Sequence, residues 1–355
     1  ALVRSSFRTL LKISCVSAVS SRIVAMTSSH VAVDTKTNTS FVFSSAESDA
    51  ELFLEREIYE IEQAPSFDSL IYTKTLRLGG YKLTGVPNSI NRLQQLEQLH
   101  LEDNDLAELP LGLGQLNIRV LDLQGNRLRL LPPNFSDLQF LERLRLDRNK
   151  LSCLPEDFGK LQSLEWLELQ NNRLEQLPLS FCHLVKLHML KIEDNQLCEL
   201  PAGFGKLESL RYLTLTSNCL TSLPPSFSDL RCLEHVSLEL NGLSQLPDNF
   251  GQLESLENLY LGGNRIMSLP STFGLMKSLR SLSLGPLNRF RFSCPRIAWL
   301  LGLGSLAVNS GASTEESQHL AVDTADQPSP EILGHPSSSE VAPIEKSQSP
   351  TDDVA

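Results

Sequence analysis

Leucine recurs through the middle of this 355-residue chain at a near-constant spacing. Successive anchor positions are 23 residues apart, with a single interval of 22. The ten anchors are Leu76, Leu99, Leu121, Leu144, Leu167, Leu190, Leu213, Val236, Leu259 and Leu282. Leucine accounts for 69 residues of the chain. An ordinary globular domain has a smaller share of leucine, because its core mixes several apolar residue types to fill irregular gaps. The period therefore predicts stacked supersecondary units that bury their apolar faces against each other.

Each unit follows the pattern L-x-x-L-x-L-x-x-N-x-L-x-x-L-P-x-x-F-G-x-L-x-x. The alternating L-x-L segment predicts a short strand with both leucines on one face. The asparagine five residues after the anchor is suited to a turn, because its amide can bond backbone groups. The Leu-Pro pair predicts that the opposite side of the unit is not a sheet, since proline has no N–H to donate. The phenylalanine that follows is expected to add an outer core layer.

This pattern resembles the leucine-rich repeat over about residues 71–290. The resemblance implies an α/β solenoid, or horseshoe, with a concave parallel sheet of about ten strands and convex loops or 3₁₀ turns. The terminal units depart from the pattern, with Tyr81 and Leu287 at the asparagine position. Such departures are expected at the ends of a repeat array.

Two segments precede the repeats. Residues 1–43 are interpreted as disordered or as a leader, because the first 33 residues are serine-rich and basic with no acid. That composition also fits a mitochondrial transit peptide. Residues 44–70 are expected to form an N-terminal capping helix, with Ser48 opening a capping box and Pro65 ending the helix. Its apolar stripe needs a surface to cover, and the end of a solenoid provides one.

Two further segments follow the repeats. Residues 291–309 are apolar and are expected to cap the C-terminal end of the array. Within them, Arg296–Trp299 resembles the docking motif for the catalytic subunit of protein phosphatase 1, although the same residues suit a cap. Residues 310–355 are rich in serine, proline and acids, which predicts a disordered tail.

Candidate binding residues flank the anchors, because these positions face away from the leucine core in an alternating strand. The position before the anchor forms a row of large side chains on successive strands, which are favoured at interaction sites. The position after it alternates in charge, from Asp122 to Lys191. The first row could instead pack on itself and the second could neutralise itself. The predicted protein-binding residues are Arg143, Arg145, Trp166, Glu168, Met189, Lys191, Tyr212, His235 and Tyr260.

Two further groups of charges lie near this face. Glu102, Asp147, Glu193 and Glu239 are expected to form an acidic margin three residues after their anchors. A basic region is expected near the second to fourth asparagine turns, which together with the acids favours a partner of mixed charge. It comprises Arg127, Arg143, Arg145, Arg148, Lys150 and Arg173.

Several classes of function are disfavoured. The net charge of −11 argues against a nucleic-acid binder, and no run of 18 apolar residues predicts a membrane helix. No P-loop, G-x-G-x-x-G, H-E-x-x-H or G-x-S-x-G motif occurs, and the histidines and cysteines show no metal-ligand spacing along the chain. We therefore expect no catalytic residue, metal, cofactor or small-molecule substrate. His100 and His235 are interpreted as contact residues.

The repeat variant resembles an intracellular group that includes Ras suppressor protein, scribble and erbin. This resemblance implies a non-enzymatic scaffold that binds a protein on its concave face, in Ras-type small GTPase pathways. The alternative is a regulatory subunit of an enzyme such as protein phosphatase 1. Seven cysteines without a C-x-x-C pair favour a reducing compartment, hence a cytoplasmic location, or a mitochondrial one if the leader is genuine. The identity of the partner stays open.

Overall fold

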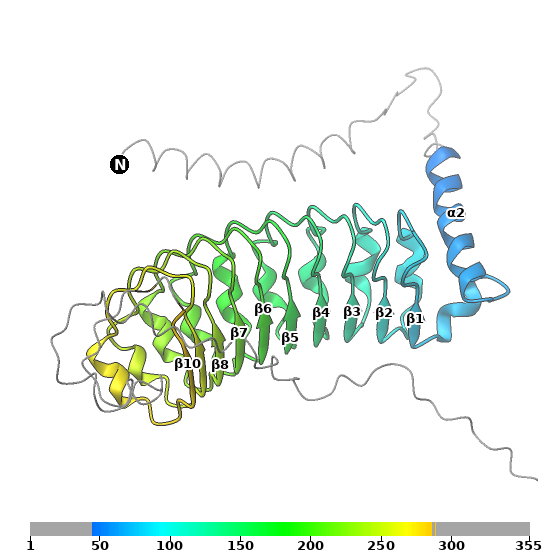
Figure 1. Ribbon diagram of the computed structural model, residues 1–355. Coiled ribbons are helices and arrows are strands. Elements are labelled where there is room, and N and C mark those ends of the chain that lie inside the picture. The colour runs from blue at the N-terminus through cyan, green and yellow to red at the C-terminus, as the bar shows by residue number, and fades with distance from the viewer. Residues whose placement is uncertain (1–44, 286–287, 289–355) are drawn as a thin grey trace, which may run out of the picture. The chain divides into compact units, whose positions relative to one another are not determined.

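The computed structural model describes residues 45–285 and residue 288. Ten three-residue strands form one parallel sheet, and each strand pairs with the strand of the next unit (Figure 1). The strands are β1 Thr75–Arg77, β2 Gln98–His100, β3 Val120–Asp122, β4 Arg143–Arg145, β5 Trp166–Glu168, β6 Met189–Lys191, β7 Tyr212–Thr214, β8 His235–Ser237, β9 Asn258–Tyr260 and β10 Ser281–Ser283. The anchors face each other across the pairs, as Leu144 and Leu167 do between β4 and β5. The predicted parallel solenoid is confirmed.

The other side of each unit runs through a short 3₁₀ helix. These helices are η1 Phe67–Tyr72, η2 Asn88–Arg92, η3 Leu111–Gln115, η4 Phe135–Asp137, η5 Phe158–Lys160, η6 Leu179–His183, η7 Phe204–Lys206, η8 Pro225–Asp229, η9 Phe250–Gln252 and η10 Ser271–Leu275. The proline of the repeat fixes the entry to this turn. Its carbonyl accepts the N–H of the phenylalanine three residues later, at 2.9 Å from Pro224 O to Phe227 N.

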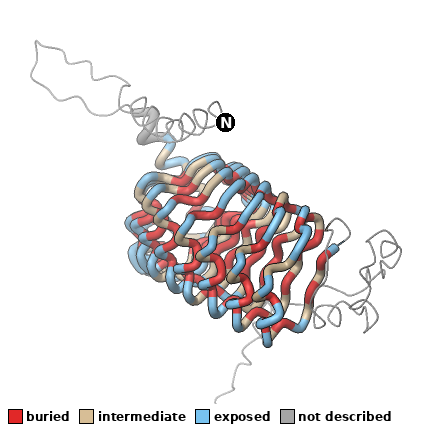
Figure 2. The backbone as a smooth tube through the Cα atoms, turned by 90° about the vertical axis from the view of Figure 1, so that its left-hand side faces the viewer, coloured by how far each residue is buried: buried red, intermediate tan, exposed pale blue. Residues whose placement is uncertain are grey.

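The core consists of two apolar layers that run the length of the array. Nearly all anchors are fully buried, and so are the phenylalanines of the repeat, namely Phe135, Phe158, Phe181, Phe204, Phe227 and Phe250. Neighbouring phenylalanine rings are stacked with centroids 6.1 Å apart for Phe227 and Phe250. Figure 2 shows the consequence, since buried positions recur in every coil along the stack. Each unit therefore gains its core only by contact with its neighbours.

One asparagine per unit satisfies the backbone at the end of the strand. The side chain of Asn195 donates to the carbonyls of Leu169, Ile192 and Glu193 at 3.0, 3.2 and 3.1 Å. Its Oδ1 accepts the N–H of Leu174 at 3.0 Å. The same arrangement recurs from Asn104 to Asn264. The amides thus form a buried ladder between coils, in a region with too few strand residues to pair the backbone alone.

The last unit corrects one sequence expectation. The repeat pattern places Leu287 where the other units have their asparagine, which predicted that the last unit lacks the ladder amide. Asn288, one residue later, supplies that amide instead. Its Oδ1 accepts the N–H of Ile266 at 2.9 Å and its Nδ2 donates to Leu261 O at 2.8 Å. In the sequence this asparagine lies six residues after the anchor instead of five. Gly285 has a φ of 61°, a conformation that glycine adopts without steric cost.

The helix α2 spans Ser45–Ile61, with Ile58 buried against the first units. It begins before Ser48, so the capping box predicted at Ser48 lies inside the helix rather than at its start. The carboxylate of Glu51 instead accepts the N–H of Ser89 at 2.7 Å. Just after the helix, the carboxylate of Glu62 accepts the N–H of Arg77 in β1 at 3.1 Å.

Several expectations concern parts of the chain outside the described residues. They are the leader at 1–43, the cap at 291–309 with the docking motif Arg296–Trp299, and the acidic tail at 310–355. Within the described part, no helix combines the length and apolar character needed to cross a bilayer.

The asparagine ladder generates a stability prediction. Asn195→Ala should lower the free energy of unfolding by at least about 2 kcal/mol, because it leaves buried backbone groups without partners. The neighbouring exposed Gln196→Ala should change it by less than about 0.5 kcal/mol. Urea unfolding followed by circular dichroism measures both values. Equal stabilities of the two variants would show that the amide is not needed.

Candidate protein-interaction surface

The sheet face is the side of the sheet formed by the residues immediately before and after each anchor. On it, the residues before the anchors of β5 to β8 lie opposite one another in register, namely Trp166, Met189, Tyr212 and His235. All four are half-buried rather than freely exposed. Tyr212 and His235 pack on each other across β7 and β8, as the sequence allowed.

The aromatic half of this row is a stack. The ring of His235 lies parallel to that of Tyr212 with centroids 4.4 Å apart, and it meets the ring of Tyr260 at 5.3 Å in a tilted arrangement. Burial lowers the pKa of His235, which favours the neutral imidazole. Burial, with the nearby Glu193 and Tyr260, raises the pKa of Tyr212. This half therefore presents an uncharged aromatic surface.

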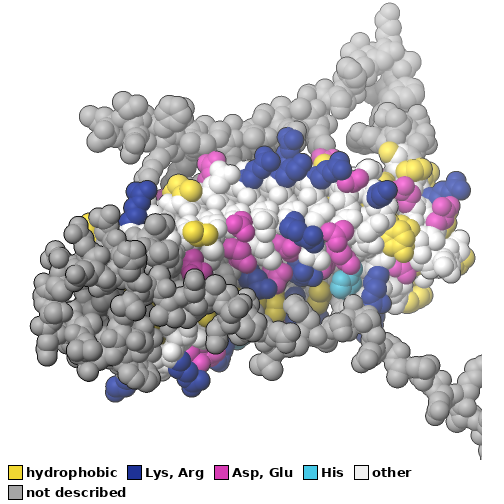
Figure 3. All heavy atoms as spheres, in the orientation of Figure 1, with side chains coloured by type: hydrophobic (Ala, Val, Ile, Leu, Met, Phe, Trp, Pro, Cys, Tyr) yellow, Lys and Arg dark blue, Asp and Glu magenta, His cyan; other side chains and the backbone are white. Residues whose placement is uncertain are grey.

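The other half of the sheet face is a network of ion pairs centred on Arg145. Its guanidinium lies 2.9 Å from Asp122 Oδ2 and 3.1 Å from Glu168 Oε2. The Nζ of Lys191 reaches Glu168 Oε1 at 3.0 Å. The alternation of charge along the row thus forms the self-neutralising ladder that the sequence indicated. Figure 3 shows acidic and basic side chains adjoining one another on the molecular surface.

Burial governs the carboxylates of this network. It raises the pKa of Asp122 and of Asp147, against the opposing effect of Arg145. Burial acts in the same direction on Glu168, but there the charge and hydrogen bond of Lys191, the indole of Trp166 and Arg145 outweigh it, so the pKa of Glu168 lies below its ordinary value. Arg145 is thus shared among three acids, and it compensates the burial of Asp122 and Asp147 only in part.

Trp166 packs within the charged half. Its indole N–H donates to Glu168 Oε1 at 3.0 Å. The guanidinium of Arg143 and the ammonium of Lys191 lie 6.0 and 5.9 Å from the ring centroid, which are cation–π distances. Five of the predicted residues therefore form one connected cluster, namely Arg143, Arg145, Trp166, Glu168 and Lys191.

The structure adds residues that the sequence reasoning missed. Gln124 accepts a hydrogen bond from Arg145 at 2.6 Å. Thr214 donates to Glu193, and the hydroxyls of Thr216 and Ser237 are 2.7 Å apart. The repeat period was the signal in the sequence, since the two residues of each pair are 21 residues apart and so belong to neighbouring units.

The predicted basic region is less basic than its composition suggests. Arg127 lies 2.6 Å from Asp105, and Arg148 lies 3.2 Å from Asp103. These pairs neutralise much of the positive charge near the turns. The expectation of a partner with mixed charge stays a prediction.

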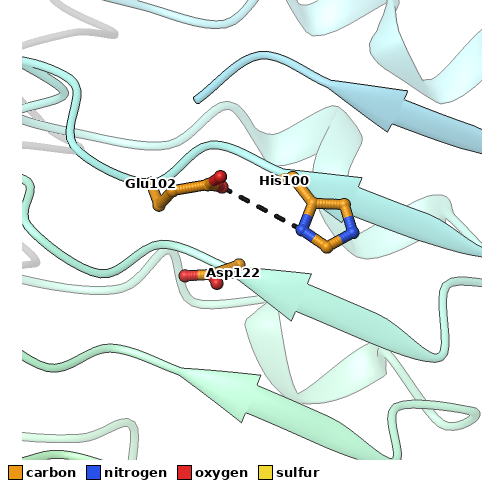
Figure 4. Close-up of side chains that lie close together, drawn as sticks. All are labelled: His100, Glu102 and Asp122. Carbon is orange, nitrogen blue, oxygen red and sulfur yellow. Dashed lines mark ion pairs between the residues drawn. The ribbon is translucent and has the colours of Figure 1, made fainter. Parts of the chain in front are cut away.

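Three further groups come together at the N-terminal end of the sheet face. His100 and Glu102 belong to one unit and Asp122 to the next, and one potential ligand atom of each lies within 4.8 Å of the others. Figure 4 shows the Glu102 carboxylate turned toward the His100 imidazole, above Asp122. His100 and Asp122 are one repeat apart in the sequence. A search for metal ligands at short spacings along the chain would therefore not find this group.

The charge network yields a prediction that depends on pH. Arg145→Met should destabilise the fold by about 3 kcal/mol at pH 7, because it leaves buried carboxylates without their partner. Arg145 lowers the pKa of Asp122, Asp147 and Glu168. Its removal should raise these three pKa values, so the folded variant binds more protons than the folded unmodified chain. Its deficit in unfolding free energy should therefore shrink as pH falls from 7 to 4.

Denaturant titrations across this pH range test the prediction. Arg129→Met is the matched control, since Arg129 is exposed and makes no ion pair with any residue in the described part. A deficit for Arg145→Met that is constant with pH would contradict the assigned role.

Comparisons with known proteins agree with this architecture. The leucine-rich repeat region family matches residues 117–211 and 202–323, together more than half of the chain. A solved structure of the leucine-rich repeat ectodomain of the membrane receptor kinase GASSHO1/SCHENGEN3 from Arabidopsis thaliana, in complex with CASPARIAN STRIP INTEGRITY FACTOR 2, is 28% identical with a TM-score of 0.57. It covers 63% of this chain and 28% of that one.

Two other solved structures are similar. A TDR receptor is 30% identical with a TM-score of 0.55, over 61% of this chain and 39% of that one. A leucine-rich repeat protein of Leptospira interrogans is 30% identical with a TM-score of 0.46, over 64% and 70% of the two chains. The chain thus spans less than half the length of either receptor. With its repeated units and its family match, the chain belongs to the leucine-rich repeat family.

Proposed function

We propose that this chain is a non-enzymatic scaffold that binds a protein partner on the sheet face across β4 to β9. One observation carries the proposal. Large side chains line successive strands without interruption, from Arg143 through Trp166, Met189 and Tyr212 to His235. Arginine, tryptophan and tyrosine dominate the energetics of protein interfaces.

The packing of this row favours binding. Tyr212 is held by the ring of His235, and Trp166 by its hydrogen bond to Glu168. Side chains that are already held in one arrangement lose less conformational freedom when a partner arrives. The row therefore offers apolar contact area at a low entropic cost.

The two halves of the face specify different chemistry in the partner. The ion-pair network around Arg145 favours a partner segment with alternating charges, which can exchange pairs with Asp122, Glu168 and Lys191. The uncharged stack of Tyr212, His235 and Tyr260 favours an apolar or aromatic segment beside it. Because the charges are largely balanced within the network, a polyanion is a poor match.

The comparisons support a protein as the ligand, since the GASSHO1/SCHENGEN3 ectodomain was solved in complex with CASPARIAN STRIP INTEGRITY FACTOR 2. The repeat pattern resembles the Ras suppressor, scribble and erbin group, so we propose cytoplasmic signalling with a Ras-type small GTPase as the first partner to test. A phosphatase catalytic subunit docked through Arg296–Trp299 is the second, and a peptide of that segment would compete for it.

A binding experiment tests the sheet face. Trp166→Ala combined with Tyr212→Ala should weaken the binding of purified, nucleotide-loaded Ras-type GTPases, or of partners identified by affinity purification, at least tenfold. Biolayer interferometry measures the affinities.

The matched control is Tyr72→Ala combined with Phe140→Ala, which removes two exposed aromatic rings that lie outside the strands. It should leave the affinity unchanged. If every partner bound the Trp166/Tyr212 variant as tightly as the unmodified chain, the sheet face would not be the binding surface.

A further inference from the structure

We propose that His100, Glu102 and Asp122 form a Zn²⁺ site on the sheet face, at β2 and β3. The imidazole nitrogen and two carboxylate oxygens lie within 4.8 Å of one another. Zinc sites with three protein ligands of the nitrogen and oxygen type keep a fourth position for water or another ligand. This position lies beside the binding row proposed above, which begins at β4, and shares Asp122 with the ion-pair network around Arg145.

The Glu102 carboxylate is the first reason for the assignment. Its Oε2 is buried and makes no hydrogen bond within the described structure. It lies 4.0 Å from the Nδ1 of His100, too far for a hydrogen bond between them. A buried carboxylate oxygen without a donor is costly, and a cation between these two atoms would supply the missing partner.

The backbone makes room for this carboxylate. A Cβ built on Gly79 would lie 2.4 Å from Glu102 Oε1. Glycine at this position therefore leaves the space that the Glu102 side chain fills, and Figure 4 shows the Glu102 carboxylate directed toward His100. Any larger residue would displace the carboxylate from the cluster.

Asp122 supplies the third ligand from a fixed position. Its side chain is 7% exposed, and its oxygens accept the N–H of Gln124 at 3.1 Å and the Nη1 of Arg145 at 2.9 Å. A carboxylate oxygen has two lone pairs, so each retains one for a metal. The bonds to Gln124 and Arg145 orient the ligand, as outer partners do in metal sites.

The required closure is small. Ligand atoms around tetrahedral zinc lie about 3.3–3.5 Å apart, given bonds of about 2.0–2.2 Å. The His100 and Glu102 side chains are partly exposed at 26% and 32%, so both can rotate by the necessary amount while Asp122 stays in place. Because these two side chains are partly exposed, water or a side chain of another protein could reach the site as the fourth ligand.

Isothermal titration of the untagged, chelator-treated full chain with ZnCl₂ tests the site. We expect one Zn²⁺ per chain with micromolar or tighter affinity. His100→Ala and Glu102→Gln should each weaken binding at least tenfold. Gly79→Ala should also weaken it, although every ligand is still present. His188→Ala, at an exposed histidine outside the cluster, should have no effect.

Cobalt substitution separates this site from the cysteines. Co²⁺ bound by nitrogen and oxygen gives weak visible bands, whereas a thiolate ligand adds an intense charge-transfer band. The proposal is overturned if Co²⁺ shows the thiolate band, if His100→Ala binds Zn²⁺ as well as the unmodified chain, or if no Zn²⁺ binds at micromolar concentration. Circular dichroism confirms that each variant is folded.

Discussion

The asparagine amide between coils is the interaction on which this structure depends. Each unit has only three strand residues, so the sheet cannot pair most of its backbone. The amide of Asn195 and its equivalents bonds carbonyls of its own coil and of the preceding one, and accepts an N–H from that coil. This fixes each coil at one register relative to the next, and the leucine and phenylalanine layers then align along the array.

That register determines the surface as well as the core. Residues one repeat apart become neighbours, so the chemistry of the sheet face is a set of rows read across strands. Arg145 illustrates this, because its partners Asp122 and Glu168 lie one repeat before and one repeat after it. The charged side chains after the anchors pair largely with one another. The aromatic side chains of Tyr212, His235 and Tyr260 are partly buried by contact with one another. The surface available to a partner is therefore partly buried and already ordered.

The repeat period predicted the strands, the 3₁₀ turns and the rows of side chains across the sheet face, because every unit carries the same sequence pattern. It did not predict features that depend on one side-chain rotamer or one extra residue. Asn288 supplies the last amide from six residues after its anchor instead of five. Likewise, the bond from Trp166 to Glu168, and the approach of Glu102 to His100 above Asp122, follow from rotamers that no spacing along the chain specifies.

The contact between Glu62 and β1 has a consequence for self-association. An edge strand offers unpaired N–H groups on which a strand from another molecule can grow the sheet. In β1 the N–H of Arg77 is already engaged by the carboxylate of Glu62. A second copy could pair a strand with β1 only after the hydrogen bond between the Arg77 N–H and the Glu62 carboxylate is broken. One carboxylate therefore disfavours end-to-end polymerisation at this edge of the sheet.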